Sequence, residues 1–481
     1  MKINRKKLFI ENFLAYGAIN ALDKIVPLVM LPIVTRLITD TSDYGRFEMF
    51  NTIVGFGSSF AVLGMYDAMF REYFEKDSLE YKSIVTSTSA KIVFLSASIV
   101  SLLLVVFSKT TSQLFLNTPE NWAIAVLAGL GTFLSANKTI ISAPTRIKNQ
   151  RHVYIFSGIS YSLLFYLLAI FFIKLGLNYK GLIYGQLIAS SYILLFFYVL
   201  NRKDFNFSLF DIKVAKELFK IGIPLVPCFV IYWAFHSMDK IMISHMLGLK
   251  EVGIYSIGAK VASVSTFIYV AFAGGWQYFA FSTMKDKDQV ELTSKIFEYL
   301  AIVSFILFAT AALFNEFIFN LFFIGDYVNG SIVFPYLFLS PLILMLFQTA
   351  GNQLLVVKKS YLITICLSLG LLVNLLLNYL LIPIYGIKGA AFATLLGYIG
   401  PTLIMIYTTY YIKLLNINTR FILACLLTFI IISYLFYANN IHYSILIIAI
   451  FIYLGIYYKL LYVNAKQLVA KLITWSLFDL F

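Results

Sequence analysis

Long apolar runs recur along the whole chain and are separated by short polar segments. A transmembrane helix needs about 20 mainly apolar residues. Fourteen runs near this length occur, at 12–35, 47–70, 84–107, 121–143, 153–173, 181–200, 217–244, 253–281, 296–318, 332–356, 360–382, 389–411, 421–437 and 443–461. The runs are continuous, whereas strands of a membrane barrel alternate between apolar and polar residues. The pattern therefore predicts an all-α integral membrane protein of about fourteen helices.

The composition favours the same class. Hydrophobic residues make up 60% of the chain and charged residues only 12%, whereas a soluble chain carries about 25% charged residues. The net charge of +14 is spread over short segments between the runs. It does not form the solvated basic face that nucleic-acid binding requires. We therefore expect membrane lipid, and no nucleic acid, as a partner.

The three cysteines lie inside apolar runs, at Cys228, Cys366 and Cys425. No CxxC pair or Cys/His cluster occurs, so the sequence predicts no metal site, no cofactor and no disulfide. We interpret these cysteines as small packing residues.

The distribution of basic residues sets the orientation. With the N-terminus in the cytoplasm, 25 of the 37 Lys and Arg residues fall in inner segments, 7 in outer segments and 5 within runs. Basic residues concentrate in cytoplasmic loops, so we expect both termini to be cytoplasmic. The first run continues past Pro32 and is too long for a signal peptide, so we interpret it as a retained helix.

Two turn motifs repeat at one offset. Asp43-Tyr44-Gly45 opens the second run and Glu251-Val252-Gly253 opens the eighth, 208 residues later. Gly181 and Gly389, which open the sixth and twelfth runs, are also 208 residues apart. Such spacing predicts two six-helix bundles in a parallel pseudo-two-fold repeat, plus two extra C-terminal helices. The expected parts are a first half (1–200), a cytoplasmic linker (201–216), a second half (217–412), and two further helices with a cytoplasmic tail (413–481).

Polar stripes run along the first helices of each predicted half. A charge inside the membrane costs at least ~2.5–3.5 kcal/mol, so it should face protein or water. Lys24 lies on a stripe of the first run, Lys240 on the seventh and Lys260 on the eighth. Lys91 and Lys138 add positive charge in the third and fourth runs, and the five lysines inside runs against few acids favour a cationic cavity that binds a phosphate or diphosphate. The predicted substrate-binding residues are Lys24, Lys240, Lys260, Arg36, Arg46, Lys91 and Lys138; catalytic residues are not predicted.

Two of these lysines have another interpretation. Lys91 and Lys138 lie nearer the cytoplasmic ends of their runs. Their ammonium groups can reach the headgroup region by snorkelling.

Four titratable residues on the stripes are candidates for ion coupling or charge pairing. Asp23 and Asp239 each adjoin a lysine in sequence, so we expect them to stay ionised and to hold that lysine, as structural ion pairs or as exchangeable partners. Glu48 has no lysine beside it and is the first choice for proton or sodium coupling. His236 is the second choice, because imidazole titrates near physiological pH, although a hydrogen-bonded core histidine fits equally well. The chain has no GxxxxGK[ST] loop, so we expect an ion gradient to drive any transport.

Several segments together resemble the polysaccharide transporter family of the multidrug/oligosaccharidyl-lipid/polysaccharide exporter superfamily. They are Pro32-Ile33-Val34-Thr35-Arg36 through Gly45, Ile223-Pro224 through Ile243, Val252-Gly253-Ile254-Tyr255, Trp276-Gln277, and Asn374, Asn378, Ile382-Pro383 and Tyr385 through Ala391. The resemblance covers about residues 8–412. It implies a Wzx-type O-antigen or capsule repeat-unit flippase of the bacterial cytoplasmic (inner) membrane. Such a protein moves undecaprenyl-diphosphate-linked oligosaccharide from the inner to the outer leaflet. It also implies other polysaccharide-assembly membrane proteins as partners, and we expect a monomer.

Other functions remain open to different degrees. A flippase for lipid-linked peptidoglycan precursors would need a similar cationic cavity. A drug or organic-cation antiporter of the same superfamily should instead show net acidic charge in the cavity. A membrane glycosyltransferase or polymerase usually carries long outer loops with catalytic residues, and the predicted outer segments are short. We therefore expect a transporter and not an enzyme.

Overall fold

Every regular element that the structure describes is a helix, as the continuous apolar runs predict. The structure is a computed structural model that describes residues 26–206, 208–282, 288–357, 359, 361–438 and 442–458. The first helix covers Val26–Leu37. The elements after it are α2 (Thr41–Ala61), α3 (Met65–Tyr73), α4 (Leu79–Val106), α5 (Ser108–Leu116), η1 (Pro119–Asn121), α6 (Trp122–Ile141), α7 (Ala143–Ile147), α8 (Arg151–Phe172), η2 (Ile173–Leu177), α9 (Asn178–Asn201), α10 (Ile212–Gly222), η3 (Ile223–Leu225), α11 (Val226–Met246), α12 (Leu249–Ala262), α13 (Val264–Ser282), α14 (Gln289–Phe322), η4 (Gly325–Ile332), α15 (Phe334–Val356), α16 (Tyr361–Tyr411), α17 (Thr419–Tyr437) and α18 (Tyr443–Ile456).

Nine helices in the described residues are long and apolar enough to cross a membrane. The number rises to 11 if α2 with α3, and α12 with the first part of α13, each form one bent span of 44°. Val26–Leu37 and Tyr443–Ile456 are shorter apolar helices. α16 has 51 residues and is interrupted at Gly386, whose φ of 61° favours glycine. At 1.5 Å per residue its length would be about 77 Å, against about 30 Å for the hydrocarbon core. The count of fourteen spans stays a prediction.

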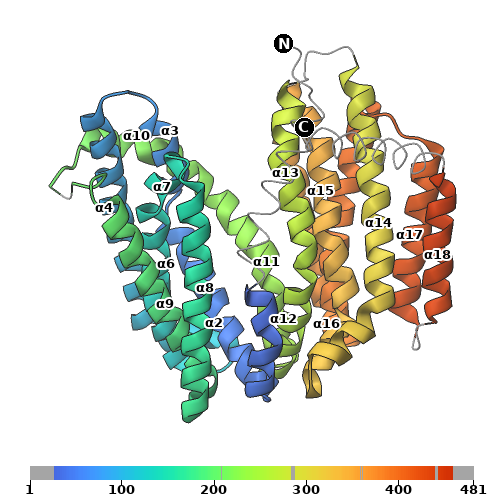
Figure 1. Ribbon diagram of the computed structural model, residues 1–481, viewed down its shortest axis with the longest axis horizontal. Helices are drawn as coiled ribbons and strands as arrows, with labels where there is room; N and C mark the ends of the chain where they lie inside the picture. The colour runs from blue at the N-terminus through green and yellow to red at the C-terminus, as the bar shows by residue number, and fades with distance from the viewer. Residues whose placement is uncertain are drawn as a thin grey trace, which may run out of the picture.

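The helices form two groups that meet at one end and diverge toward the other (Figure 1). α2 to α9 belong to one group, and α12 to α18 belong to the other. α11 runs obliquely between them and packs against both α2 and α16. The groups meet where α2 packs against α12, and they diverge toward the end that holds α3 and α10. This layout places α2, α11 and α12 at the junction of the two groups.

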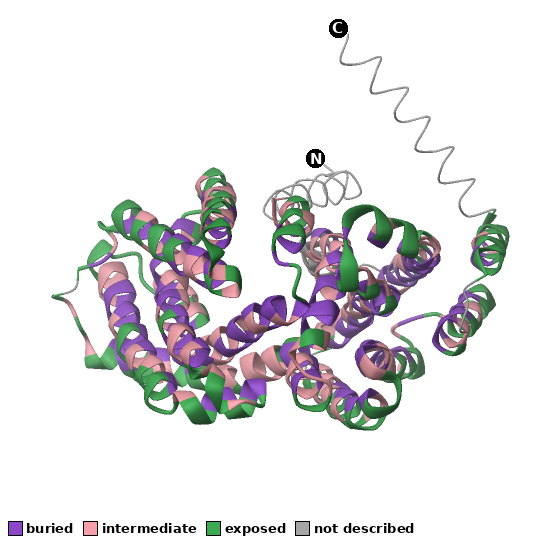
Figure 2. Cartoon of the chain, turned by 90° about the horizontal axis from the view of Figure 1, so that it is seen from below, coloured by how far each residue is buried: buried purple, intermediate pink, exposed green. Residues whose placement is uncertain are grey.

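Large apolar side chains cover much of the outside of each group. Figure 2 shows buried residues gathered inside the two groups and exposed residues on their outer faces. Leu95 and Phe429 are both 63% exposed. Contiguous apolar surface of this kind needs a partner other than water, and membrane lipid supplies it.

Two glycines let α2 and α12 approach at backbone distance. A Cβ atom built on Gly45 would lie 2.0 Å from the carbonyl oxygen of Leu249, and one built on Gly253 would lie 2.0 Å from that of Thr41. Thr41 and Leu249 are separated by 208 residues, as are Gly45 and Gly253. The contact is therefore symmetric about the predicted repeat, which explains why both turn motifs contain glycine.

The second repeated glycine pair shows the same symmetry. A Cβ atom built on Gly181 would lie 3.0 Å from the backbone nitrogen of Ile173. One built on Gly389 would lie 2.4 Å from the carbonyl oxygen of Leu381. Ile173 and Leu381 are again 208 residues apart. In each group this glycine permits a tight turn between two successive helices.

The linker between the groups forms an amphipathic helix, α10. The side chain of Asp211 accepts hydrogen bonds from the Lys213 and Val214 amides and caps its N-terminus. α10 packs against α3 and α4. Up to Gly222 the chain thus lies along the first group of helices.

We expect Gly45→Ala and Gly253→Ala each to destabilise the protein, because the added methyl group would meet backbone that cannot rotate away. Overpacking of this kind costs about 1–3 kcal/mol. Thermal unfolding followed by size-exclusion chromatography measures the loss. Gly400→Ala is the control, since nothing lies within 4 Å of a Cβ there. Equal stability of Gly45→Ala and Gly400→Ala would contradict the contact.

Candidate functional site

A buried carboxylate lies between two lysines where the two groups of helices meet. Glu48 of α2 is 2% exposed. Lys240 of α11 donates a hydrogen bond from Nζ to Glu48 Oε2 at 2.7 Å. The Nζ atom of Lys260, from α12, lies 2.5 Å from Glu48 Oε1. This second contact is an ion pair.

Aromatic residues of α2 complete the surroundings of Lys260. Its ammonium group donates a hydrogen bond to the Tyr44 hydroxyl at 2.7 Å. It also lies 5.0 Å from the centre of the Tyr44 ring and 5.5 Å from that of Phe47, within the range of cation–π attraction. We call Tyr44, Glu48, Lys240 and Lys260 the inter-group cluster.

The inter-group cluster carries one positive charge in excess, because two ammonium groups face one carboxylate. Glu48 is enclosed, but the side chains of Lys240 and Lys260 are 19% and 39% exposed. A second anion can therefore reach the two ammonium groups from their exposed side. Lysine acts as a compact charge with three donors, which suits a phosphate group.

Neighbouring contacts fix the position of α2 against α11. The indole nitrogen of Trp233 donates to the carbonyl oxygen of Thr52 at 3.1 Å. Its ring packs on Phe56 with 4.9 Å between the ring centres. This packing holds Lys240, two turns further along α11, opposite Glu48 of α2.

A second buried carboxylate, Asp239, lies among neutral hydrogen-bond donors. Tyr255 and Thr394 donate to its Oδ2 atom at 2.7 and 2.6 Å, and Asn378 donates to its Oδ1 atom at 2.6 Å. Asn374 is 3.5 Å from Oδ1 and 3.3 Å from the Thr394 hydroxyl. We call these five residues the Asp239 cluster. No ion pair to Asp239 occurs among the described residues.

The Asp239 cluster is rich in oxygen atoms that could hold a cation. The side-chain oxygen Oδ1 of Asn378 is buried and has no hydrogen-bond partner. A buried polar atom without a partner requires an explanation. Carboxylate, amide and hydroxyl oxygens are ligands for hard cations.

In the part of the chain that the structure describes, Glu48 contacts lysines and Asp239 does not, which is the reverse of what their neighbours in the sequence suggest. Glu48 was expected to stand apart from lysine, yet it contacts Lys240 and Lys260. Asp239 was expected to hold the adjacent lysine, yet it faces α12 and α16. Consecutive residues on a helix point about 100° apart, so Asp239 and Lys240 meet different neighbours.

The other predicted residues lie outside the inter-group cluster. Arg46 pairs with Asp43 at 2.6 Å and lies over the Tyr179 ring. Lys91 lies over Phe210 and Lys138 over Tyr161. His236 is exposed, with Nδ1 2.9 Å from the Tyr232 carbonyl oxygen. Lys24 and Asp23 lie outside the described residues.

A large apolar cavity borders α12, the helix that carries Lys260. Its volume is about 790 Å³, and it lies between Val26–Leu37 and α12 to α15. Val261, next to Lys260 in sequence, lines it, as do Phe314 and Phe338. Arg36 is the only charged side chain among the described residues that line it.

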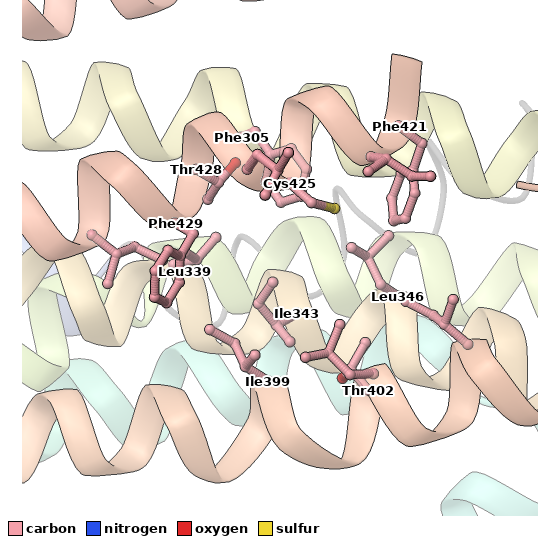
Figure 3. A pocket seen from close by; sticks show the side chains of 15 residues that line it. Phe305, Leu339, Ile343, Leu346, Ile399, Thr402, Phe421, Cys425, Thr428 and Phe429 are labelled. Carbon is pink, nitrogen blue, oxygen red and sulfur yellow. The ribbon is translucent and has the colours of Figure 1, made fainter. Parts of the chain in front are cut away.

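A smaller apolar pocket of about 260 Å³ lies between α14, α15, α16 and α17. Figure 3 shows Phe305, Ile343 and Phe421 around it, with the Cys425 sulfur among them. Apart from Cys425, only Thr402 and Thr428 bring a polar atom to it. It suits an acyl or prenyl chain and not a polar ligand.

Sequence reasoning did not assign a role to Tyr44, Tyr255 or Thr394. Asn374 and Asn378 were noted only for their resemblance to a family, although their i, i+4 spacing marks one helix face. A buried amide pair in an apolar run indicates a polar partner nearby, and that signal could have pointed to Asp239.

Solved structures of similar fold are membrane transporters. One is the lipid II flippase MurJ in an inward closed conformation. The match covers 95% of this chain and 100% of the MurJ chain, with a TM-score of 0.67 and 15% identity. The Vibrio cholerae MATE transporter VcmN, in a mutant form, matches 85% of this chain over 98% of its own, with a TM-score of 0.60 and 15% identity. An inward-facing multidrug resistance MATE transporter of the MOP superfamily matches 81% of this chain over 94% of its own, with a TM-score of 0.64 and 13% identity. The chain therefore has the fold of the MurJ and MATE transporters.

The sequence assigns the chain to one family. Residues 33–324 match the model of the family described as polysaccharide biosynthesis protein, and the chain belongs to that family. An uncharacterized membrane protein of Methanocaldococcus jannaschii is 25% identical over 328 residues, which are 63% of this chain. The match spans 64% of that relative's length. The predicted resemblance is confirmed at the level of family and fold.

Proposed function

We propose that the protein is a flippase that moves undecaprenyl-diphosphate-linked oligosaccharide repeat units across the cytoplasmic membrane by alternating access. The observation that carries the proposal is the inter-group cluster. Lys240 and Lys260 are partly exposed, come from adjoining helices, and share one carboxylate from the other group. Two lysines that share one carboxylate are prepared to bind a second, stronger anion.

The diphosphate of the substrate would compete with Glu48 for the two lysines. Charge-assisted hydrogen bonds from ammonium to phosphate oxygens are among the stronger polar contacts in proteins. A diphosphate also offers more negative charge than one carboxylate. Its arrival would weaken the ion pairs between Glu48 and the lysines, which join the two groups of helices.

The apolar part of the substrate needs an apolar path beside this site. The cavity of about 790 Å³ supports such a path, since Val261 of α12, the helix that carries Lys260, lines it. The polar headgroup could thus stay at the inter-group cluster while the lipid chain remains among apolar side chains and membrane lipid.

The layout of the two groups supports alternating access. They meet at α2 and α12 and diverge toward α3 and α10, an end that the basic residues of α10 mark as cytoplasmic. In this state the substrate would enter from the inner leaflet. Release of Glu48 from the lysines would allow the α2–α12 contact to open, with both termini staying cytoplasmic. The protein is proposed to act as a monomer, together with other membrane proteins of polysaccharide assembly.

The Asp239 cluster is the proposed site of ion coupling. Among the described residues its carboxylate has neutral partners only, and the Asn378 oxygen, which has no hydrogen-bond partner there, provides a further ligand. We propose Na⁺ as the coupling ion, with a proton as the alternative. Asp239 lies next to Lys240 on α11. A cation there would change the charge beside the substrate-binding lysine.

One alternative substrate shares this chemistry. The fold resembles that of the lipid II flippase MurJ, and a lipid-linked peptidoglycan precursor would also bring a diphosphate to the lysines. An organic cation, as expected for a drug antiporter, would be repelled by the excess positive charge of the inter-group cluster. The identity of the lipid-linked oligosaccharide that accumulates on the inner leaflet when the protein is deleted distinguishes the two flippase substrates.

We expect Lys240→Ala and Lys260→Ala each to reduce surface polysaccharide without lowering the amount of protein. Loss of one charge-assisted hydrogen bond corresponds to about 10- to 100-fold weaker binding. Arginine at either position should restore part of the export, because charge matters more than shape for a diphosphate. Immunodetection of surface glycan in cells that depend on this protein gives the measurement. Lys109→Ala, at an exposed lysine of α5, is the control. Normal export in both lysine variants would contradict the proposed site.

We expect Na⁺ to stabilise the purified protein more than K⁺ or choline at equal ionic strength, because a ligand bound only by the folded state raises stability. Asp239→Asn should abolish the difference in melting temperature. Glu48→Gln is the matched control, since it neutralises the buried carboxylate of the inter-group cluster and should retain the response. A sodium response that survives in Asp239→Asn would remove this cluster from the coupling mechanism.

A further inference from the structure

A polar pocket of about 470 Å³ opens at the end of the second group, away from the inter-group cluster. Asn315 and Glu316 reach it from α14, Tyr336 from α15, Lys388 from α16 just after the Gly386 break, and Tyr443 from the start of α18. η4, which packs against α12, contributes Ser331. The pocket therefore lies at the end where α2 and α12 meet, the predicted outer side of the membrane.

One atom in this pocket lacks a partner. Asn315 is 4% exposed, and its Nδ2 atom donates to the Ser331 carbonyl oxygen at 2.9 Å. That bond fixes the amide, because the reversed orientation would bring two oxygens together. The remaining oxygen, Oδ1, is buried and has no hydrogen-bond partner. A ligand that donates a hydrogen bond would satisfy it.

The charges of the pocket balance. Glu316 adds an anionic acceptor and already receives the Tyr443 hydroxyl. Lys388 adds a cationic donor and lies 5.5 Å from the centre of the Phe436 ring, with no ion-pair partner in the described part of the chain. A bound anion would be repelled by Glu316 and a bound cation by Lys388, so a neutral ligand fits best.

We propose that this pocket binds a sugar residue. Asn315 Oδ1 and the Glu316 carboxylate are two acceptors for sugar hydroxyl groups, while Lys388 can donate to a ring or hydroxyl oxygen. Tyr336 and Tyr443 supply aromatic walls. The volume lies within the usual range of about 300–1,000 Å³ for small-molecule sites.

The inference rests on the proposed function, because a flippase for lipid-linked oligosaccharide brings sugars to the outer side. The pocket lies on the second group alone, so it can hold a sugar while the two groups move. It would retain the glycan after its diphosphate has left the lysines and so disfavour its return.

The test measures saturation-transfer NMR of the full chain in lipid nanodiscs, with N-acetylglucosamine and glucose as neutral probes and phosphoethanolamine as a zwitterionic probe. We expect at least one sugar to bind the wild type. Glu316→Gln and Asn315→Leu should each bind it about tenfold more weakly, as for a lost hydrogen bond to a charged or buried group. Glu316 lies at the exposed rim, so Glu316→Gln should fold even where Asn315→Leu does not. Lys240→Ala should bind the sugar normally.

Two further measurements separate this proposal from the proposed function. Absence of sugar binding, binding of phosphoethanolamine alone, or undiminished sugar binding in Glu316→Gln would overturn the sugar site. If one of these outcomes is found but Lys240→Ala blocks export, the flippase proposal stands without the sugar site. If sugar binding is lost in Glu316→Gln but export is normal in Lys240→Ala and Lys260→Ala, the sugar site stands and the diphosphate site fails.

Discussion

The backbone contact between α2 and α12 is the constraint on which the rest of the site depends. Helices usually pack 8–10 Å apart, at a distance set by the side chains between them. Gly45 and Gly253 remove those side chains, so each helix meets the other's carbonyl oxygens directly. Glu48 follows Gly45 by three residues, and Lys260 follows Gly253 by seven. The close approach thus brings the carboxylate of one group within 2.5 Å of the lysine of the other.

The same ion pairs give the cluster both its stability and its capacity to change. Removing one partner of a buried ion pair costs about 3–5 kcal/mol, because the other charge is left uncompensated. An incoming anion avoids that cost for the lysines, since it replaces the carboxylate. Glu48 then loses its partners, and its separation from α11 and α12 becomes favourable. In the proposed mechanism, substrate binding and opening of the contact are linked in this way.

The sequence predicted the features that depend on periodicity. Apolar runs indicated helices, and the 208-residue offset indicated the symmetric pair Gly45 and Gly253 before any contact was known. Lys240 and Lys260 were expected to share a site, and they meet at Glu48. The partner of each acid could not be predicted from adjacency. Glu48 and Lys240 are 192 residues apart, and only the crossing of two helices brings them together.

Other residues escaped prediction for related reasons. Lys91, Lys138 and Arg46 carry the same positive charge as Lys240, but they lie against aromatic rings or pair with Asp43. Asn374 and Thr394 lie in runs that read as purely apolar spans. Their importance comes from the fold-back of α16 at Gly386, which places them beside Asp239.

The central claim is that a diphosphate displaces Glu48 and opens the α2–α12 end, and a distance measurement tests it most directly. Spin labels on cysteines introduced at Lys174 and Ile324, with the three native cysteines replaced, report on that end of each group by double electron–electron resonance. Undecaprenyl diphosphate should lengthen the distance between the labels in the wild type. It should leave that distance unchanged in the double variant Lys240→Ala with Lys260→Ala. Glu48→Gln should show the longer distance without ligand. A distance that neither the ligand nor Glu48→Gln alters would contradict the account.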